Sequence, residues 1–245
     1  MKGRKILGVI RLILLAIVTF PFFTGAFIFR PDLRKDKLAG ARYIGKWSRA
    51  LMALLGFRIQ VEGKPPEGNP YLLICNHRSS LDPLVIMSRV PGYPVAKADV
   101  SGYPMVGPGA KRVGVIFVEK TNRSSREATK QAIYKAFQEG KSILIFPEGR
   151  THAEQNTVTF QKGAFDQAAA LGIPVVPIAL DYKYTSDYWD HKETMVQHYF
   201  ANLAKWRTPV RIRFGTPIKS DNSFTLLRQS QAWIDEVISE FREGW

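Results

Sequence analysis

The sequence has very little cysteine and lacks the signature motifs of several enzyme classes. Cys75 is the single cysteine in 245 residues, which excludes an intrachain disulfide and a thiolate metal cluster. The sequence contains no G-x-S-x-G and no H-E-x-x-H, which argues against a serine hydrolase with a nucleophile elbow and against a zinc metalloprotease. The glycine-rich segment 102–114 has the spacing of neither G-x-G-x-x-G nor G-x-x-x-x-G-K-[ST], so no dinucleotide-binding fold or P-loop is indicated.

Acidic residues are scarce relative to basic ones. Lys and Arg together number 35 against 21 for Asp and Glu, which gives a formal net charge of +14. Such a balance favours an anionic partner, either nucleic acid or an anionic membrane surface. The chain has no recognisable nucleic-acid-binding module, and its N-terminus is strongly apolar. We therefore expect membrane lipids as a partner and do not expect nucleic acid.

The apolar N-terminal segment, residues 6–29, predicts a membrane anchor. It is interrupted by Arg11 and Pro21, and a bilayer core needs about 20 apolar helical residues. A single span remains open, as does a helix broken at Pro21 that forms a shallow hairpin or lies partly in the interface. A cleaved signal peptide is less favoured because the run is long and a basic segment follows it. Basic residues flank the segment and favour the cytoplasmic face of the membrane: Lys2, Arg4, Lys5, Arg30, Arg34, Lys35 and Lys37.

Residues 37–57 predict a basic amphipathic helix. Apolar side chains recur at helical spacing from Leu38 to Leu54, and the segment carries four basic residues: Lys37, Arg42, Lys46 and Arg49. The helix could lie at a membrane interface or pack on the core of the domain, and the pattern alone leaves both open.

The remainder of the chain alternates between strand and helix patterns. Short apolar runs predict strands at 71–75, 113–118, 142–146, 175–180 and 210–214. Helical patterns cover 124–140, 162–172 and the C-terminal segment from residue 224. We therefore predict an α/β domain with a mixed, largely buried sheet flanked by helices, at residues 58–245, after N-terminal membrane-associated helices at residues 1–57.

The segment ICNHRSSLDP, residues 74–83, places a histidine and an aspartate where a strand ends and a helix can begin. His77 can accept a proton near neutral pH, and a carboxylate such as Asp82 can fix its tautomer and stabilise its protonated form. Pro83 suits the first turn of a helix. The alternative is an ordinary turn in which Ser79 or Ser80 caps that helix, and the spacing of His77 and Asp82 alone favours this alternative.

A second strand end carries charged residues. In ILIFPEGRT, residues 143–151, an apolar run leads to Glu148 and Arg150. Ligands of open α/β sheets bind at the carboxyl ends of the strands, and a guanidinium suits phosphate. A surface turn with an ordinary Glu–Arg pair is the alternative.

Together these blocks resemble the glycerolipid acyltransferases over roughly residues 70–182. Five blocks in order carry the resemblance: NHRSSLD at 76–82, AKADVSGYPMVG at 96–107, GVIFVEK at 114–120, FPEGRT at 146–151 and VVPIAL at 175–180. The family's usual patterns are N-H-x4-D, G-x-x-F-x-x-R and F-P-E-G-T-R. The third block here ends in Lys120 where arginine is usual, and Arg150 stands one place early.

The resemblance implies that His77 is the general base and that Asp82 is its partner. It also implies a set of substrate-binding residues: Asn76, Lys97, Lys120, Glu148, Gly149, Arg150 and Thr151. The implied reaction moves an acyl group from acyl-CoA or acyl carrier protein to the hydroxyl of 1-acyl-glycerol-3-phosphate, with no cofactor or metal. Another lysolipid acceptor, or less readily a non-catalytic lipid-binding protein, is the alternative.

Overall fold

A seven-stranded mixed sheet forms the centre of the molecule. The computed structural model describes residues 2–28, 38–68, 70–102, 106–118 and 123–245. The strand order is β1-β7-β6-β2-β5-β3-β4. The strands β6, β2, β5, β3 and β4 run parallel to one another, whereas β7 pairs antiparallel with β6 and parallel with β1. The bounds are β1 Phe57–Glu62, β2 Leu72–Cys75, β3 Tyr93–Lys97, β4 Ile116–Val118, β5 Ile143–Ile145, β6 Val175–Tyr182 and β7 Thr208–Phe214.

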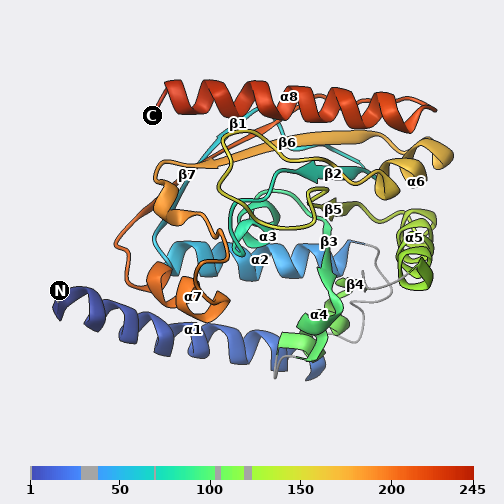
Figure 1. The fold of residues 1–245 in the computed structure, drawn as a ribbon. Coiled ribbons are helices and arrows are strands. Elements are labelled where there is room, and N and C mark those ends of the chain that lie inside the picture. Colours follow the sequence, from blue (N-terminus) through green and yellow to red (C-terminus); the bar gives the residue numbers. More distant parts are fainter. Residues whose placement is uncertain (1, 29–37, 69, 103–105, 119–122) are drawn as a thin grey trace.

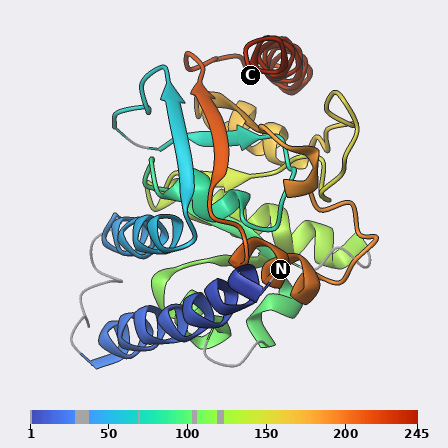
Figure 2. The same cartoon turned by 90° about the vertical axis from the view of Figure 1, so that its left-hand side faces the viewer.

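Helices cover both faces of this sheet (Figures 1 and 2). Successive side chains of a strand point to opposite faces, so Leu73 and Cys75 of β2 face one apolar cluster while Leu72 and Ile74 face the other. The first cluster contains α2 (Ala39–Leu54) and α3 (Asp82–Met87), and the second contains α5 (Arg123–Gln138), α6 (Gly163–Leu171) and α8 (Ser223–Glu243). These observations confirm the predicted mixed α/β fold with a buried central sheet.

The N-terminal helix α1 (Lys2–Ile28) lies outside α2, on the side of the molecule opposite α8 (Figure 1). It contacts α2, α4 (Val106–Val113) and α7 (Met195–Leu203). The helix continues through Pro21, so the alternative of a helix broken at this residue, which the sequence left open, is not what the structure shows. Pro21 lies on the exposed side of α1, away from the packed interface, and proline inside a helix can kink it without ending it. No helix in the described ranges has the length and hydropathy to cross a membrane.

The amphipathic segment after α1 packs on the sheet. Ile44, Leu51 and Met52 of α2 are buried in the first cluster, while Arg42, Lys46 and Arg49 are exposed. The turn at Leu55–Gly56 leads directly into β1. Each fully buried aliphatic side chain contributes roughly 1.5–3 kcal/mol, so α2 stabilises the sheet that it covers.

The sequence patterns did not predict strands β1 and β3, and they placed the start of the strand at 113–118 too early. The edge strand β1 alternates in burial, and β3 contains Pro94, which weakens the strand signal. The run 113–118 is a strand only from Ile116, because Val113 ends α4 and Gly114 turns the chain with a φ of +94°.

Candidate active site

The site lies at the carboxyl ends of β2 and β5, where parallel strands release the chain into turns. Asn76 follows β2 and is fully buried. Its Nδ2 donates to the carbonyl oxygen of Leu180 at 2.8 Å, and its Oδ1 accepts the N–H of Leu180 at 2.9 Å. The side-chain amide of Asn76 therefore extends the pairing of β2 with β6 by one residue. Both of its polar atoms are hydrogen-bonded to the backbone of Leu180.

His77 and Asp82 form a hydrogen-bonded pair. The Nδ1 of His77 lies 2.8 Å from Oδ2 of Asp82. Because a carboxylate only accepts, Nδ1 carries the proton, and the Nε2 lone pair is left to accept another. Within the described part of the chain, Nε2 has no partner, and the His77 side chain is 18% exposed. Asp82 is the first residue of α3 and Pro83 follows it in the first turn, as predicted.

The carboxylate of Asp82 is fully buried and accepts four hydrogen bonds. Besides His77, the backbone N–H groups of Arg78 and Ser79 donate to Oδ2 at 2.6 and 2.7 Å. The phenol of Tyr182 donates to Oδ1 at 2.6 Å. The turn from residue 77 to residue 82 is thus wound around this carboxylate. The residue before α3 is Leu81, which makes no side-chain cap, while Oγ of Ser79 accepts the N–H of Leu81 at 3.3 Å. The serine contact and the His77–Asp82 pair therefore occur in the same turn.

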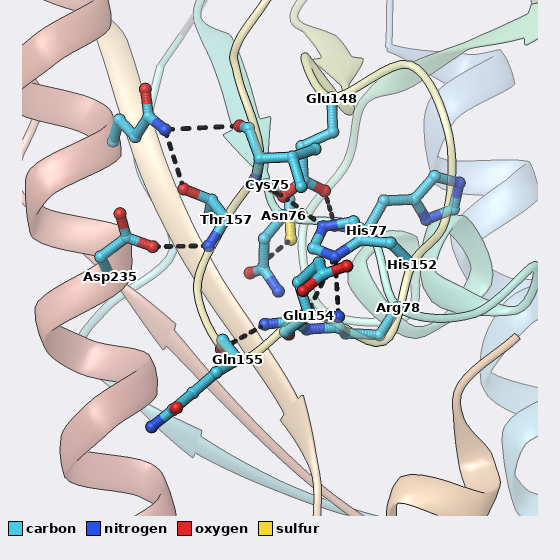
Figure 3. A network of polar contacts seen from close by, with 12 residues as sticks. Cys75, Asn76, His77, Arg78, Glu148, His152, Glu154, Gln155, Thr157 and Asp235 are labelled. Carbon is cyan, nitrogen blue, oxygen red and sulfur yellow. Dashed lines mark hydrogen bonds and ion pairs between the residues drawn. The ribbon is translucent and has the colours of Figure 1, made fainter. Parts of the chain in front are cut away.

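Glu148 connects the two turns of the site (Figure 3). Its Oε2 accepts the backbone N–H of His77 at 2.6 Å, and its Oε1 accepts Nε2–H of His152 at 2.8 Å. The N–H of Val158 adds a third donor at 3.3 Å. The ring of Phe146 stacks on the imidazole of His77, with centroids 4.1 Å apart. Glu148 therefore holds the backbone of His77 in place.

The tautomer of His152 follows from its contacts. Its Nδ1 accepts the N–H of Glu154 at 3.2 Å and faces Nη1 of Arg78 at 3.3 Å, so the proton lies on Nε2 and points at Glu148. Arg78 is fully buried, donates to the carbonyl oxygens of Glu154 and Gln155, and lies 5.3 Å from the ring centre of Tyr188. His152 is a buried member of this network.

The other candidate residues of the second turn differ in exposure. Gly149 has a φ of +74°, a left-handed conformation that favours glycine, and its N–H donates to the carbonyl oxygen of Phe146. Arg150 is exposed and, among the described residues, has no ion-pair partner. Thr151 is buried, with Oγ1 3.0 Å from Nε2 of His191.

The two predicted lysines are less completely described. Lys97 ends β3, so its backbone lies at the same edge of the sheet as the ends of β2 and β5. Lys120 lies outside the described residues, as do residues 29–37 with their predicted basic flank. The role of Lys97 and Lys120 in substrate binding, which the family resemblance implies, stays a prediction.

Two residues near the pair were not identified from the sequence. Tyr182 lies 100 positions from the aspartate that it contacts, and no local pattern distinguishes it from a core aromatic. Burial raises its pKa well above the ordinary value, and the charge of Asp82 raises it further. His198 is buried, with Nε2 3.0 Å from the hydroxyl of Ser79 and Nδ1 3.1 Å from Glu193. Desolvation lowers the pKa of His198, although Glu193 opposes this.

Comparison with known proteins shows that the sequence of this chain is similar to those of acyltransferases. The acyltransferase family model matches residues 58–181, just over half of the chain. A lyso-ornithine lipid O-acyltransferase from Pseudomonas aeruginosa is 31% identical over 137 residues, covering 56% of this chain and 52% of the relative. A 1-acyl-sn-glycerol-3-phosphate acyltransferase from Neisseria meningitidis is 28% identical over 142 residues, covering 58% and 56% respectively. The chain thus spans about half the length of these curated relatives.

A solved structure extends the comparison to the whole fold. The crystal structure of the 1-acyl-sn-glycerophosphate acyltransferase PlsC from Thermotoga maritima aligns over 99% of both chains. The TM-score is 0.74 and the sequence identity is 18%. At this identity the likeness establishes the fold, including the N-terminal helices.

Proposed function

Because the chain belongs to the acyltransferase family, we propose that it moves a fatty acyl group from an acyl thioester to the free hydroxyl of 1-acyl-glycerol-3-phosphate. The product would be phosphatidic acid. The observation that carries the proposal is the His77–Asp82 pair, in which Nδ1 is held by a carboxylate and Nε2 is free to accept a proton. Thioester-dependent acylation of lysophosphatidate by the purified full chain tests it directly. If no lysolipid is acylated, the non-catalytic lipid-binding alternative replaces it.

In the proposed reaction the acceptor itself is the nucleophile. His77 Nε2 takes the proton of the acceptor hydroxyl while the oxygen attacks the thioester carbonyl carbon. The tetrahedral intermediate collapses, the C–S bond breaks, and the thiolate leaves with the proton from His77. Asp82 stabilises the imidazolium during these steps. No protein nucleophile is required, which accords with the missing serine elbow and predicts no acyl-enzyme.

The proposed donor is acyl-CoA or acyl carrier protein, which acts as a co-substrate. The thioester supplies the activated acyl group, so the proposed chemistry requires neither a redox cofactor nor a metal.

The phosphate of the acceptor is proposed to bind beside the second turn. Arg150 is exposed there, and Gly149 sets the turn that carries it. Lys97 and Lys120 are the other proposed cations, and Thr151 lines the same turn. A lysolipid of amino-acid type is the second candidate acceptor, because one relative is named for a lyso-ornithine lipid and because Lys120 and Arg150 depart from the usual pattern.

Replacing Arg150 with alanine is expected to weaken the use of lysophosphatidate. A charge-assisted hydrogen bond contributes about 1.5–3 kcal/mol, so the acceptor KM should rise roughly ten- to hundredfold while the donor KM is unchanged. Arg228→Ala on α8 is the matched control, because Arg228 is also an exposed arginine but lies on a helix that covers the opposite face of the sheet from α2 and α3. An unchanged acceptor KM in Arg150→Ala, or equal acylation of phosphate-free lysolipids, would favour the second acceptor.

We further propose that α1 brings the site to the cytoplasmic face of a membrane. The helix packs inward through Arg11, whose guanidinium donates to the carbonyl oxygens of Leu203 and Lys205 at the end of α7. Its outward side is a stripe of exposed apolar residues at helical spacing: Ile6, Val9, Ile10, Ile13, Ile17 and Phe20. Such a stripe supports binding to the boundary of headgroups and acyl chains.

Phe20→Glu is expected to weaken binding of the full chain to anionic vesicles by about tenfold or more, because it replaces an exposed apolar ring that is proposed to enter the membrane boundary with a negative charge. Phe224→Glu is the matched control. The two phenylalanines are 56% and 58% exposed, but Phe224 lies on α8, on the far side of the molecule (Figure 1). Co-sedimentation with vesicles measures the difference. Equal binding of the two variants would contradict the proposed membrane face.

A further inference from the structure

Tyr182 donates a hydrogen bond to Oδ1 of Asp82, the carboxylate oxygen that does not face His77. It ends β6, the strand that pairs with β2 on one side and β7 on the other. Its side chain is buried, and its O–H donates to Oδ1 of Asp82 at 2.6 Å. In the described part of the chain, Oδ1 has no other hydrogen-bond donor, whereas Oδ2 is shared by two backbone N–H groups and His77.

We infer that Tyr182 is a positioning residue for acyl transfer, which acts on the imidazole of His77 through the carboxylate of Asp82. The inference rests on the proposed function, in which His77 is the base. Tyr182 fixes the rotation of the carboxylate so that Oδ2 faces Nδ1 of His77. It also takes up part of the negative charge, which limits how strongly Asp82 holds a protonated imidazole.

The protonation state of Tyr182 is consistent with this role. Burial raises the pKa of the phenol, and the neighbouring negative charge of Asp82 raises it further, so the O–H remains a donor at working pH. A hydrogen bond between a neutral donor and a buried carboxylate is short and strong. Removing the O–H leaves a buried carboxylate oxygen without a donor and concentrates the negative charge toward His77.

Five other charged or titratable side chains lie around His77, Asp82 and Tyr182. They come from the two turns, from β2, from the segment between β6 and α7, and from α7 itself: Cys75, Arg78, Glu148, Asp187 and His198. All of them are retained when tyrosine becomes phenylalanine. A change in the pH dependence of the variant therefore reports the lost O–H.

The chain contains a matched control in Tyr188. Its O–H donates to Oδ1 of Asp181 at 2.5 Å, and burial with the charge of Asp181 raises its pKa to about 12. The rings of Tyr182 and Tyr188 lie 6.2 Å apart. Tyr188→Phe thus removes the same group from a neighbouring carboxylate that binds Arg242 and not His77.

The first experiment compares the pH profiles of kcat/KM for Tyr182→Phe, Tyr188→Phe and the unmodified full chain. Tyr182→Phe should lose about tenfold in kcat with little change in acceptor KM, and the acidic limb of its profile should move to higher pH. The direction follows because Asp82, without the phenol, favours the protonated imidazole. Tyr188→Phe should show neither change. Equal losses in the two variants, or an unmoved acidic limb in Tyr182→Phe, would overturn the inference.

A second experiment does not depend on activity. The ring resonances of His77 are titrated by NMR in the full chain without substrate, and the midpoint should move upward in Tyr182→Phe but not in Tyr188→Phe. A fluorotyrosine at position 182 keeps the shape of the side chain and is a stronger donor, so it should move the midpoint downward even if the phenylalanine variant folds poorly. Absence of both shifts overturns the inference. A shifted midpoint in a chain that acylates no lysolipid overturns the proposed function and leaves the coupling intact.

Discussion

Replacing His77 with alanine is expected to reduce acyl transfer by about 10²–10⁴-fold, the range contributed by a general base. The expected loss lies in kcat, because the imidazole removes a proton only as the hydroxyl attacks. The fold should survive, since the bond that ties this residue to Glu148 comes from the backbone N–H and alanine retains it. The measurement is the rate of thioester-dependent acylation, with thermal unfolding followed in parallel.

One outcome would contradict the assignment of His77 as the base. A folded His77→Ala variant that keeps a tenth or more of the original turnover would show that another group takes the proton. The buried histidines are poor substitutes, because His152 directs its proton at Glu148 and His198 is occupied by Ser79 and Glu193.

Asp82→Asn is expected to reduce transfer by roughly 10²–10³-fold, less than the about 10⁴-fold loss seen when the corresponding change inverts the tautomer in a serine-protease triad. The surroundings of Asp82 explain the difference. Two backbone N–H groups meet Oδ2, so the asparagine oxygen should occupy that place and still accept from Nδ1 of His77. Its NH2 group would then face Tyr182, whose hydroxyl can turn to accept.

In this variant the histidine tautomer is retained and only the charge is lost. The imidazolium formed during transfer is no longer stabilised by a carboxylate, so kcat should fall and the acidic limb of the pH profile should move to lower pH. Rates are compared with those of Asp82→Ala, which also removes the hydrogen bond and should lose more. A larger loss in the asparagine variant than in the alanine variant would mean that the side-chain amide has turned and the tautomer is inverted.

The contact between His77 and Asp82 was predictable because its geometry is local, whereas the proposed catalytic role came from the family resemblance. His77 and Asp82 are separated by one turn of chain, and Pro83 marks the start of α3, so a short segment sets the 2.8 Å contact. The position of Glu148 at a strand end was predictable for the same reason. The direction of its carboxylate was not, because it depends on the backbone N–H of His77, in a turn 71 residues earlier in the chain.

The overall architecture was predictable wherever apolar runs were continuous. The buried strands β2, β5 and β6 follow from such runs, whereas β1 and β3 have weak patterns and are defined by their neighbours in the sheet. The sequence also left open a helix broken at Pro21, because proline by its local preference interrupts helices. The packing of α1 against α2, α4 and α7 accompanies a helix that stays continuous.

Glu148 has a consequence for any attempt to change the acceptor range of this enzyme. Its carboxylate joins the turn proposed to hold the acceptor to the backbone of the residue proposed to take the acceptor's proton. Acceptor binding and proton removal therefore both depend on the carboxylate of Glu148. Substitutions at residues 147–149 would alter turnover together with acceptor preference. The side chain of Arg150 is exposed and is not among the groups that bind the carboxylate of Glu148. Acceptor specificity is therefore best redesigned from Arg150 outward, leaving the shared carboxylate and both of its histidine contacts in place.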